Sequence, residues 1–206
     1  MLRVMVLRLR LGLAAVILLG TLVFSSPAFA RGANLAFTGG STAQRTQMTR
    51  ALAASSFDWS LLPGRVTVHI GRDFDSEAAP GEVWIDGSLL DTGRFSWGVI
   101  QHEFAHQVDF QLLSPDARDR FALLLGGSAW CWDSPGLAHR DYGCERFAST
   151  LAWAYWPSAS NTNAPLPVSK RRAVRSGVIV FANARSRSPK LWDLTSKRSR
   201  KSQSNS

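Results

Sequence analysis

The stretch QHEFAHQVD at residues 101–109 sets two histidines four residues apart, with a glutamate directly after the first. It lies within residues 99–113, which are largely apolar and contain neither Gly nor Pro, so we expect a helix there. On a helix His102 and His106 share one face, about 6 Å apart along the axis. Both imidazoles can then bind one small cation, and Glu103 can reach a water molecule on it. The stretch therefore predicts a metal site of the kind that activates water.

The alternative is that these are two core or surface histidines beside a solvated glutamate. Burying two imidazoles and a carboxylate without a metal would leave polar groups unsatisfied, which favours the metal. The apolar residues around the motif support a buried helix; they are Phe95, Trp97, Val99, Ile100, Phe104, Val108, Phe110 and Leu112.

A catalytic zinc ion normally has three protein ligands and an open fourth position. We expect Glu145 to be the third ligand, because it begins a second predicted helix at residues 143–156. The residues three, four and seven positions after Glu145 share its face and are all small: Ala148, Ser149 and Ala152. Such a face lets two helices approach closely, as a ligand donated from one helix to a metal on the other requires.

Three other polar residues have less defined roles. Asp141 and His139 are alternative third ligands. Asp109 lies three residues after His106, where its short side chain points poorly toward the metal. We expect Asp109 to orient a histidine N–H or to brace a neighbouring helix, and a plain surface aspartate is the alternative.

The run HEFAHQVD at residues 102–109, followed by ERFA at residues 145–148, resembles the gluzincin metallopeptidases. It is most similar to their small lethal-factor-like branch, with the pattern H-E-F-G-H-x-x-D and then E-x-F-A. The resemblance covers residues 82–156, about a third of the chain. It implies a zincin-like α+β fold and hydrolysis of peptide bonds.

By this resemblance His102, His106 and Glu145 are zinc ligands, and Glu103 is the general base. One departure is Ala105 where the family has Gly, which a helix should tolerate. Enzymes of this type often use a Tyr or His to donate to the oxyanion. His139 and Tyr142 are candidates, but neither stands at a matching spacing, so that role stays open.

The N-terminus has the features of a secretory signal peptide. Three arginines precede an apolar run at residues 11–24, and Ala28-Phe29-Ala30 forms an A-x-A site. We expect cleavage after Ala30. An uncleaved anchor is the alternative, but an apolar core of about 14 residues is short of the roughly 20 needed to span a bilayer. The mature protein is then secreted, with no transmembrane span.

Export changes the interpretation of the cysteines. Cys131 and Cys144 are the only two in the chain, and in an oxidising compartment we expect them to form a disulfide. The bond would hold the start of the helix that carries Glu145. Thiolate ligation of zinc is the weaker alternative, because the His and Glu set already completes a site.

The positive charge of the chain is concentrated at its C-terminus. Residues 31–169 hold 10 arginines, no lysine and 14 acidic residues, a net charge of −4. Residues 170–206 hold 11 basic residues and one Asp, a net charge of +10, and much of this tail is low in complexity. Such a tail can adhere to anionic envelope polymers, to nucleic acid without specific recognition, or to lipid head groups; a merely solvated end is the alternative.

Local patterns place the remaining elements. Ser41 and Gln44 fit a capping box that begins a helix ending near residue 55. Residues 65–70 and 82–86 are predicted strands, the second being the edge that pairs with an extended substrate. His69 lies on the first of these, and we expect it to be structural or exposed. Ser114 and Pro115 begin a helix that ends at Gly126 and Gly127.

Together these features predict a signal peptide at residues 1–30 and one α+β, zincin-like domain at residues 31–157. A linker and a basic, disordered tail are expected at residues 158–206. The expected activity is that of a secreted zinc metallopeptidase acting on peptide or protein substrates. The alternative is an inactive, zinc-stabilised binding module that the basic tail retains on an anionic cell-surface polymer.

Overall fold

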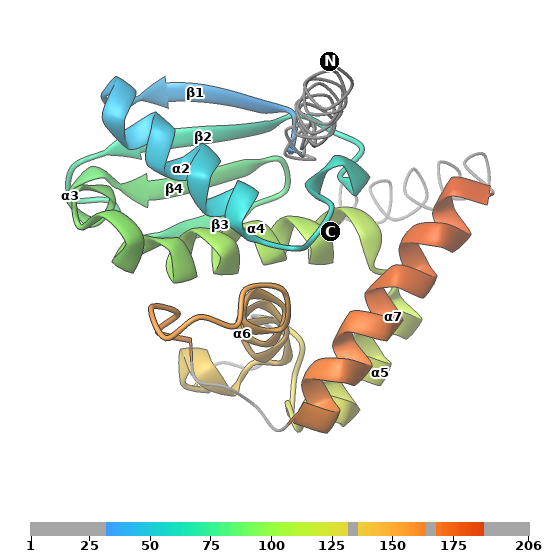
Figure 1. Cartoon of the computed structure of the whole chain (residues 1–206). Helices are drawn as coiled ribbons and strands as arrows, with labels where there is room; N and C mark the ends of the chain where they lie inside the picture. The colour runs from blue at the N-terminus through green and yellow to red at the C-terminus, as the bar shows by residue number, and fades with distance from the viewer. Residues whose placement is uncertain (1–31, 132–135, 164–167, 188–206) are drawn as a thin grey trace, which may run out of the picture.

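A four-stranded mixed sheet forms one layer of the molecule (Figure 1). The computed structural model describes residues 32–131, 136–163 and 168–187. The strands lie in the order β1 (Leu35–Gly39), β2 (Val66–Gly71), β4 (Glu82–Asp86) and β3 (Glu77–Ala79). The first three are parallel, and β3 is antiparallel to β4. Both predicted strands are present, and the fold is α+β as expected.

The prediction that residues 82–86 form the edge strand was wrong. Strand β4 has β2 on one side and β3 on the other, so the strand beside it, β3, is the edge. The physical reason is the turn at Pro80 and Gly81, where Gly81 has φ +84° and lets the chain fold back into a hairpin. Residues 77–79 are too few to show a strand pattern in the sequence. Strand β1 was not predicted either.

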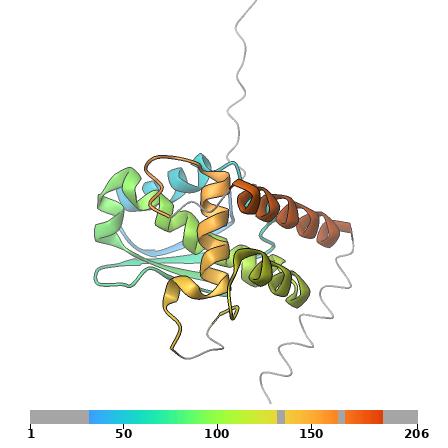
Figure 2. The same cartoon turned by 90° about the horizontal axis from the view of Figure 1, so that it is seen from below.

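Helices cover one face of the sheet and extend away from it (Figures 1 and 2). Helices α2 and α4 lie next to the strands, and α6 crosses α4 on the side away from the sheet. The α-helices are α2 (Thr42–Ala54), α3 (Gly87–Asp91), α4 (Trp97–Leu112), α5 (Pro115–Leu125), α6 (Gly143–Tyr155) and α7 (Val168–Arg187). The short 3-10 helices are η1 (Trp59–Leu61), η2 (Gly93–Ser96) and η3 (His139–Asp141).

The predicted helix boundaries at Ser41 and Ser114 are confirmed. Ser41 and Gln44 form a reciprocal capping box at the start of α2. The Ser114 hydroxyl accepts a hydrogen bond from the Ala117 amide at the start of α5, and Gly126 ends that helix in the left-handed conformation.

Helix α4 is the centre of the core. Its apolar residues Ile100, Phe104, Val108 and Leu112 are buried, as the sequence predicted. Phe95 was expected to join them, but it is 66% exposed in η2, because the chain enters α4 only at Trp97.

Helix α7 is a feature that the sequence did not predict. It follows the segment expected to be a linker and packs on α4, α5 and α6 (Figure 2). Val174 and Val178 are fully buried, and Gly177 lies so close to the Phe121 ring that a Cβ would come within 2.7 Å of it. The first part of the basic C-terminal region is therefore folded onto the domain.

The predicted signal peptide at residues 1–30 lies outside the described residues, as do residues 188–206 of the basic tail. Among the residues that the structure describes, no helix combines the length and the apolar character needed to cross a bilayer.

Candidate metal centre

His102, His106 and Glu145 lie together where α4 meets α6. His102 Nε2 is 3.0 Å from Glu145 Oε2, and His106 Nε2 is 3.4 Å from Glu145 Oε1. The two imidazole Nε2 atoms are 3.2 Å apart. Glu145 and His106 are buried, and the His102 side chain is only 12% exposed. The two histidines of the HExxH motif therefore form one compact group with Glu145, which follows the second histidine by 39 residues. This group could hold a metal ion.

The spacing of these atoms fits a tetrahedral zinc ion. Zinc binds nitrogen and carboxylate oxygen at about 2.0–2.2 Å, so neighbouring ligand atoms of a tetrahedron lie roughly 3.3 Å apart. His102 Nε2 lies near that distance from both His106 Nε2 (3.2 Å) and Glu145 Oε2 (3.0 Å), whereas the 3.4 Å contact of His106 Nε2 is with the other carboxylate oxygen, Oε1.

The protonation states of His102 and Glu145 favour binding of a metal ion. Burial lowers the pKa of His102 despite its hydrogen bond to Glu145, so its imidazole tends to be neutral. Burial alone would raise the pKa of Glu145, but hydrogen bonds from His102 and His106 hold it below its usual range, so the carboxyl is ionised. A neutral imidazole and a carboxylate are the forms that ligate zinc.

His102 is oriented by a polar residue that the sequence analysis noted only for its small size. The Ser149 hydroxyl lies 3.2 Å from His102 Nδ1. Ser149 Oγ also lies 3.5 Å from Asn163 Oδ1, and the Asn163 amide donates to the Gly98 carbonyl on α4 at 3.0 Å. These contacts turn His102 Nε2 toward Glu145. Ser149 could have been found from its position one turn after Glu145; Asn163, in the expected linker, had no such signal.

Glu103 is buried on α4 beside the histidine group. Burial raises its pKa well above the usual range, and the carboxylates of Glu145 and Glu77 add to the effect. Glu77 belongs to β3, the edge strand that packs against α4. No hydrogen bond joins Glu103 to another of the described residues, which leaves its carboxyl available to a water molecule or substrate.

His139 approaches Glu145 from η3. Its Nε2 lies 2.7 Å from Glu145 Oε2, and its side chain is 67% exposed. His139 is not one of the three residues, His102, His106 and Glu145, whose ligand atoms lie close enough together to hold one metal ion. Asp141 accepts from Arg146 at 3.0 Å instead, so the structure does not place this alternative ligand at the site. Tyr142 is buried at the start of α6.

Asp109 braces neighbouring segments, one of its expected roles. Its carboxylate accepts from Arg118 Nε of α5 at 2.7 Å and from the Trp130 indole at 3.0 Å. It is 1% exposed, so the surface alternative was wrong. His106 Nδ1, which Asp109 could have oriented, is buried without a hydrogen-bond partner among the described residues.

The Cys131–Cys144 disulfide is present, as predicted. It ties the loop after α5 to the first turn of α6, directly before Glu145. In the same place the Gly143 and Cys144 amides donate to the Ala129 and Trp130 carbonyls at 2.7 and 2.9 Å. The backbone that carries Glu145 is therefore held covalently and by hydrogen bonds.

Comparison with known proteins gives no match, either to a protein-family model, to a curated protein or to a solved structure.

Proposed function

We propose that this protein is a secreted zinc metallopeptidase in which His102, His106 and Glu145 ligate one zinc ion and Glu103 is the general base. The observation that carries the proposal is the meeting of three potential ligand residues from two helices, with a buried glutamate, Glu103, on the same helix as the histidines. The export expected from the N-terminal sequence and the Cys131–Cys144 disulfide fit an extracellular location.

A bound zinc ion would supply Lewis acidity, lowering the pKa of a coordinated water toward about 7 and polarising the scissile carbonyl. Glu103 accepts the proton of the attacking water on its carboxylate and transfers it to the leaving nitrogen. The raised pKa of Glu103 suits both steps, because the group can hold the proton between them.

Strand β3 supplies the surface for an extended peptide. It pairs with β4 on one side only, so among the described strands its other edge offers free N–H and C=O groups. The packing of α4 against β3 and the effect of the Glu77 carboxylate on the pKa of Glu103 support a substrate edge near the proposed base. A peptide added to β3 would bind through its backbone, with little dependence on its sequence.

The test separates metal binding from hydrolysis. Glu103→Gln should keep one zinc ion per chain but reduce casein or peptide-library cleavage by about 10²–10⁴-fold, because only the base is lost. Glu82→Gln is the matched control, since this glutamate is half-exposed on β4 beside His69. His106→Ala and Glu145→Ala should lose both zinc and cleavage. Cleavage by Glu103→Gln at the wild-type rate would contradict the assigned base.

The alternative function is that of an inactive, zinc-stabilised module retained on an anionic cell-surface polymer by its basic tail. It predicts full zinc content and no cleavage of any peptide by the wild type. A deletion that tests the tail should begin after residue 187, because removing α7 would expose the buried Val174 and Val178.

A further inference from the structure

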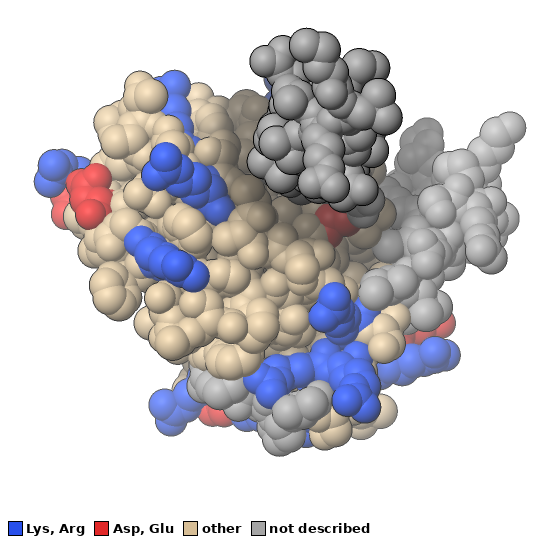
Figure 3. All heavy atoms as spheres, in the orientation of Figure 1, with Lys and Arg blue, Asp and Glu red and all other residues tan. Residues whose placement is uncertain are grey.

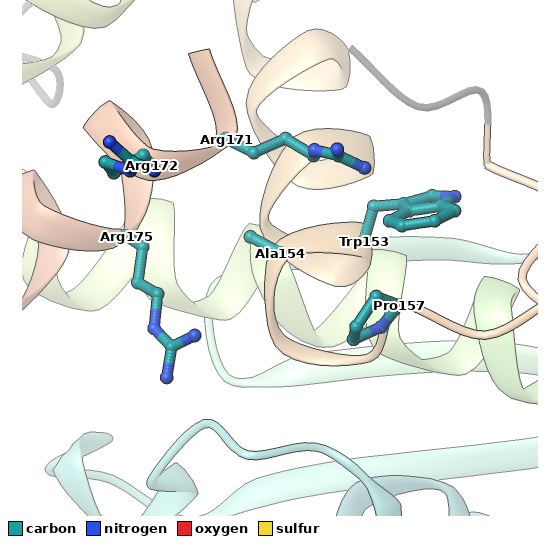
Figure 4. Close-up of a pocket in the computed structure, with 6 residues that line it drawn as sticks. All are labelled: Trp153, Ala154, Pro157, Arg171, Arg172 and Arg175. Atoms are coloured by element: carbon teal, nitrogen blue, oxygen red, sulfur yellow. The ribbon is translucent and has the colours of Figure 1, made fainter. Parts of the chain in front are cut away.

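Helices α6 and α7 border an open cavity that the metal site does not use. Its volume is about 240 Å³, and it is lined by Trp153, Ala154, Pro157, Arg171, Arg172 and Arg175. Figure 4 shows Arg171 extending from α7 toward the Trp153 ring of α6. Apolar and aromatic side chains form its floor, and the three arginines of α7 form its rim; in Figure 4 their guanidinium groups point in different directions, with that of Arg171 toward Trp153.

The rim is positive and is not neutralised within the protein. Residues 168–187 contain no acidic residue, and no ion pair joins Arg171, Arg172 or Arg175 to a carboxylate among the described residues. Arg172 and Arg175 are exposed. In Figure 3 the Lys and Arg side chains gather on the part of the face where Figure 1 places α7. This positive surface attracts anions.

These side chains are held in place by the packing of α7. The Arg171 guanidinium lies 4.7 Å from the centre of the Trp153 ring, and that of Arg175 lies 4.9 Å from the Tyr155 ring. The Tyr155 hydroxyl donates to the Arg175 carbonyl at 3.3 Å. A ligand would meet a formed surface and would not need to order a free tail.

We propose that this cavity binds an anionic phospholipid, with the phosphate on the arginine rim and the adjoining apolar part of the lipid against Trp153, Ala154 and Pro157. The pairing of apolar floor and cationic rim favours an amphiphilic anion over a purely polar polyanion such as nucleic acid. Indole rings beside basic residues are also typical of protein surfaces at the membrane–water interface.

Such binding would leave the metal centre accessible. Trp153 follows Glu145 by eight residues on α6, so the cavity and the metal centre are separated by about 12 Å along the helix axis. The protein would be held on the surface of an anionic membrane with its metal centre free to meet substrate. The inference is independent of whether that centre hydrolyses peptides.

The test is co-sedimentation of the full mature chain with vesicles of neutral phosphatidylcholine, with or without anionic phosphatidylglycerol. Binding should require the anionic lipid. The triple variant Arg171→Gln, Arg172→Gln, Arg175→Gln should weaken it roughly a hundredfold, since each basic residue near an anionic surface contributes about fivefold. The matched control is Arg198→Gln, Arg200→Gln, Lys201→Gln, which removes the same charge from the tail and should reduce binding much less.

Trp153→Ala tests the apolar floor, and it should weaken vesicle binding while circular dichroism shows an intact fold. Equal losses in the two triple variants would overturn the proposal, because general charge attraction would then suffice. Undiminished vesicle binding in the presence of excess inorganic phosphate supports a lipid ligand. Competition by free phosphate at the same concentration as the lipid would overturn it in favour of a simple phosphate site.

Discussion

The side-chain amide of Gln107 donates to the Glu82 carbonyl at 2.9 Å and so fastens helix α4 to the β3–β4 hairpin. The same amide donates to the Ala79 carbonyl at 2.8 Å, and Gln107 Oε1 accepts from the Gly81 amide at 2.9 Å. Gln107 follows His106 directly and is fully buried. One side chain therefore sets the edge strand relative to the helix that carries the proposed base.

Replacing Gln107 by Leu should loosen this hairpin. Two carbonyls, the Gly81 amide and the side-chain amide of Gln111 would each lose a hydrogen bond, and we expect a loss of about 2–4 kcal/mol in the free energy of unfolding. Hydrogen exchange at the Gly81 amide should accelerate. The matched control is Gln101→Leu. It removes another buried side-chain amide of α4, which makes one hydrogen bond, to the Ala51 carbonyl. Equal losses from both variants, with unchanged exchange at Gly81, would refute the role of Gln107.

Ser149→Ala should weaken metal binding without unfolding the protein. The hydroxyl contacts His102 Nδ1, and loss of such an outer contact typically lowers metal affinity about 10–100-fold. Competition with a chelator measures the change. The control is Ser158→Ala, a serine beyond α6 that has no contact with the histidines. An unchanged zinc affinity in Ser149→Ala would show that His102 is oriented by packing alone.

Removing the disulfide should affect both stability and the metal site. The bond closes a loop between residues separated by 13 positions, for which we expect a contribution of about 3 kcal/mol. The double variant Cys131→Ser, Cys144→Ser should show this loss in denaturant unfolding. Because Cys144 precedes Glu145, zinc should also dissociate faster. Faster unfolding with unchanged zinc dissociation would mean that the backbone hydrogen bonds alone position Glu145.

The lowered pKa of Glu145 should make the free energy of unfolding depend on pH. Treatment with a chelator removes bound metal, so that only this carboxyl group is compared. Its pKa in the folded state is lowered from the ordinary value of 4.5, so its stabilising effect is complete above that pH. The effect is lost as the pH falls below 4.5 toward the folded-state pKa. The difference in unfolding free energy between wild type and Glu145→Gln should therefore narrow with acidification. A difference that is constant from pH 7 to pH 3 would contradict the lowered pKa.

Several features of the site could be predicted because they depend on local sequence. The spacing of His102 and His106 places both on one helical face wherever the helix lies, and the small residues after Glu145 allow its helix to approach. The proximity of the three residues is confirmed. Zinc ligation and the catalytic role of Glu103 remain predictions.

Other features had no local signal. The edge was assigned to β4, because the three residues of β3 show no strand pattern until their hairpin partner is known. The basic helix α7 was taken for part of a tail. Residues 178–182 stand out in the sequence as an apolar patch that can pack on the domain, but the helix and the burial of Val174 and Val178 depend on the surface of α4, α5 and α6. Asn163 lies in a polar segment that was expected to be a linker, yet its side-chain amide donates a hydrogen bond to the Gly98 carbonyl of α4.

The sequence by itself determined the helix that carries the two histidines, the glutamate chosen as their partner and the cysteine pair, because each depends on residue type and short-range spacing. Only the tertiary structure decided which strand forms the edge, which hydroxyl contacts His102 and where the arginines of α7 lie. Those contacts join residues far apart in the chain, and their free energy arises only when the packed helices and sheet bring the partners together.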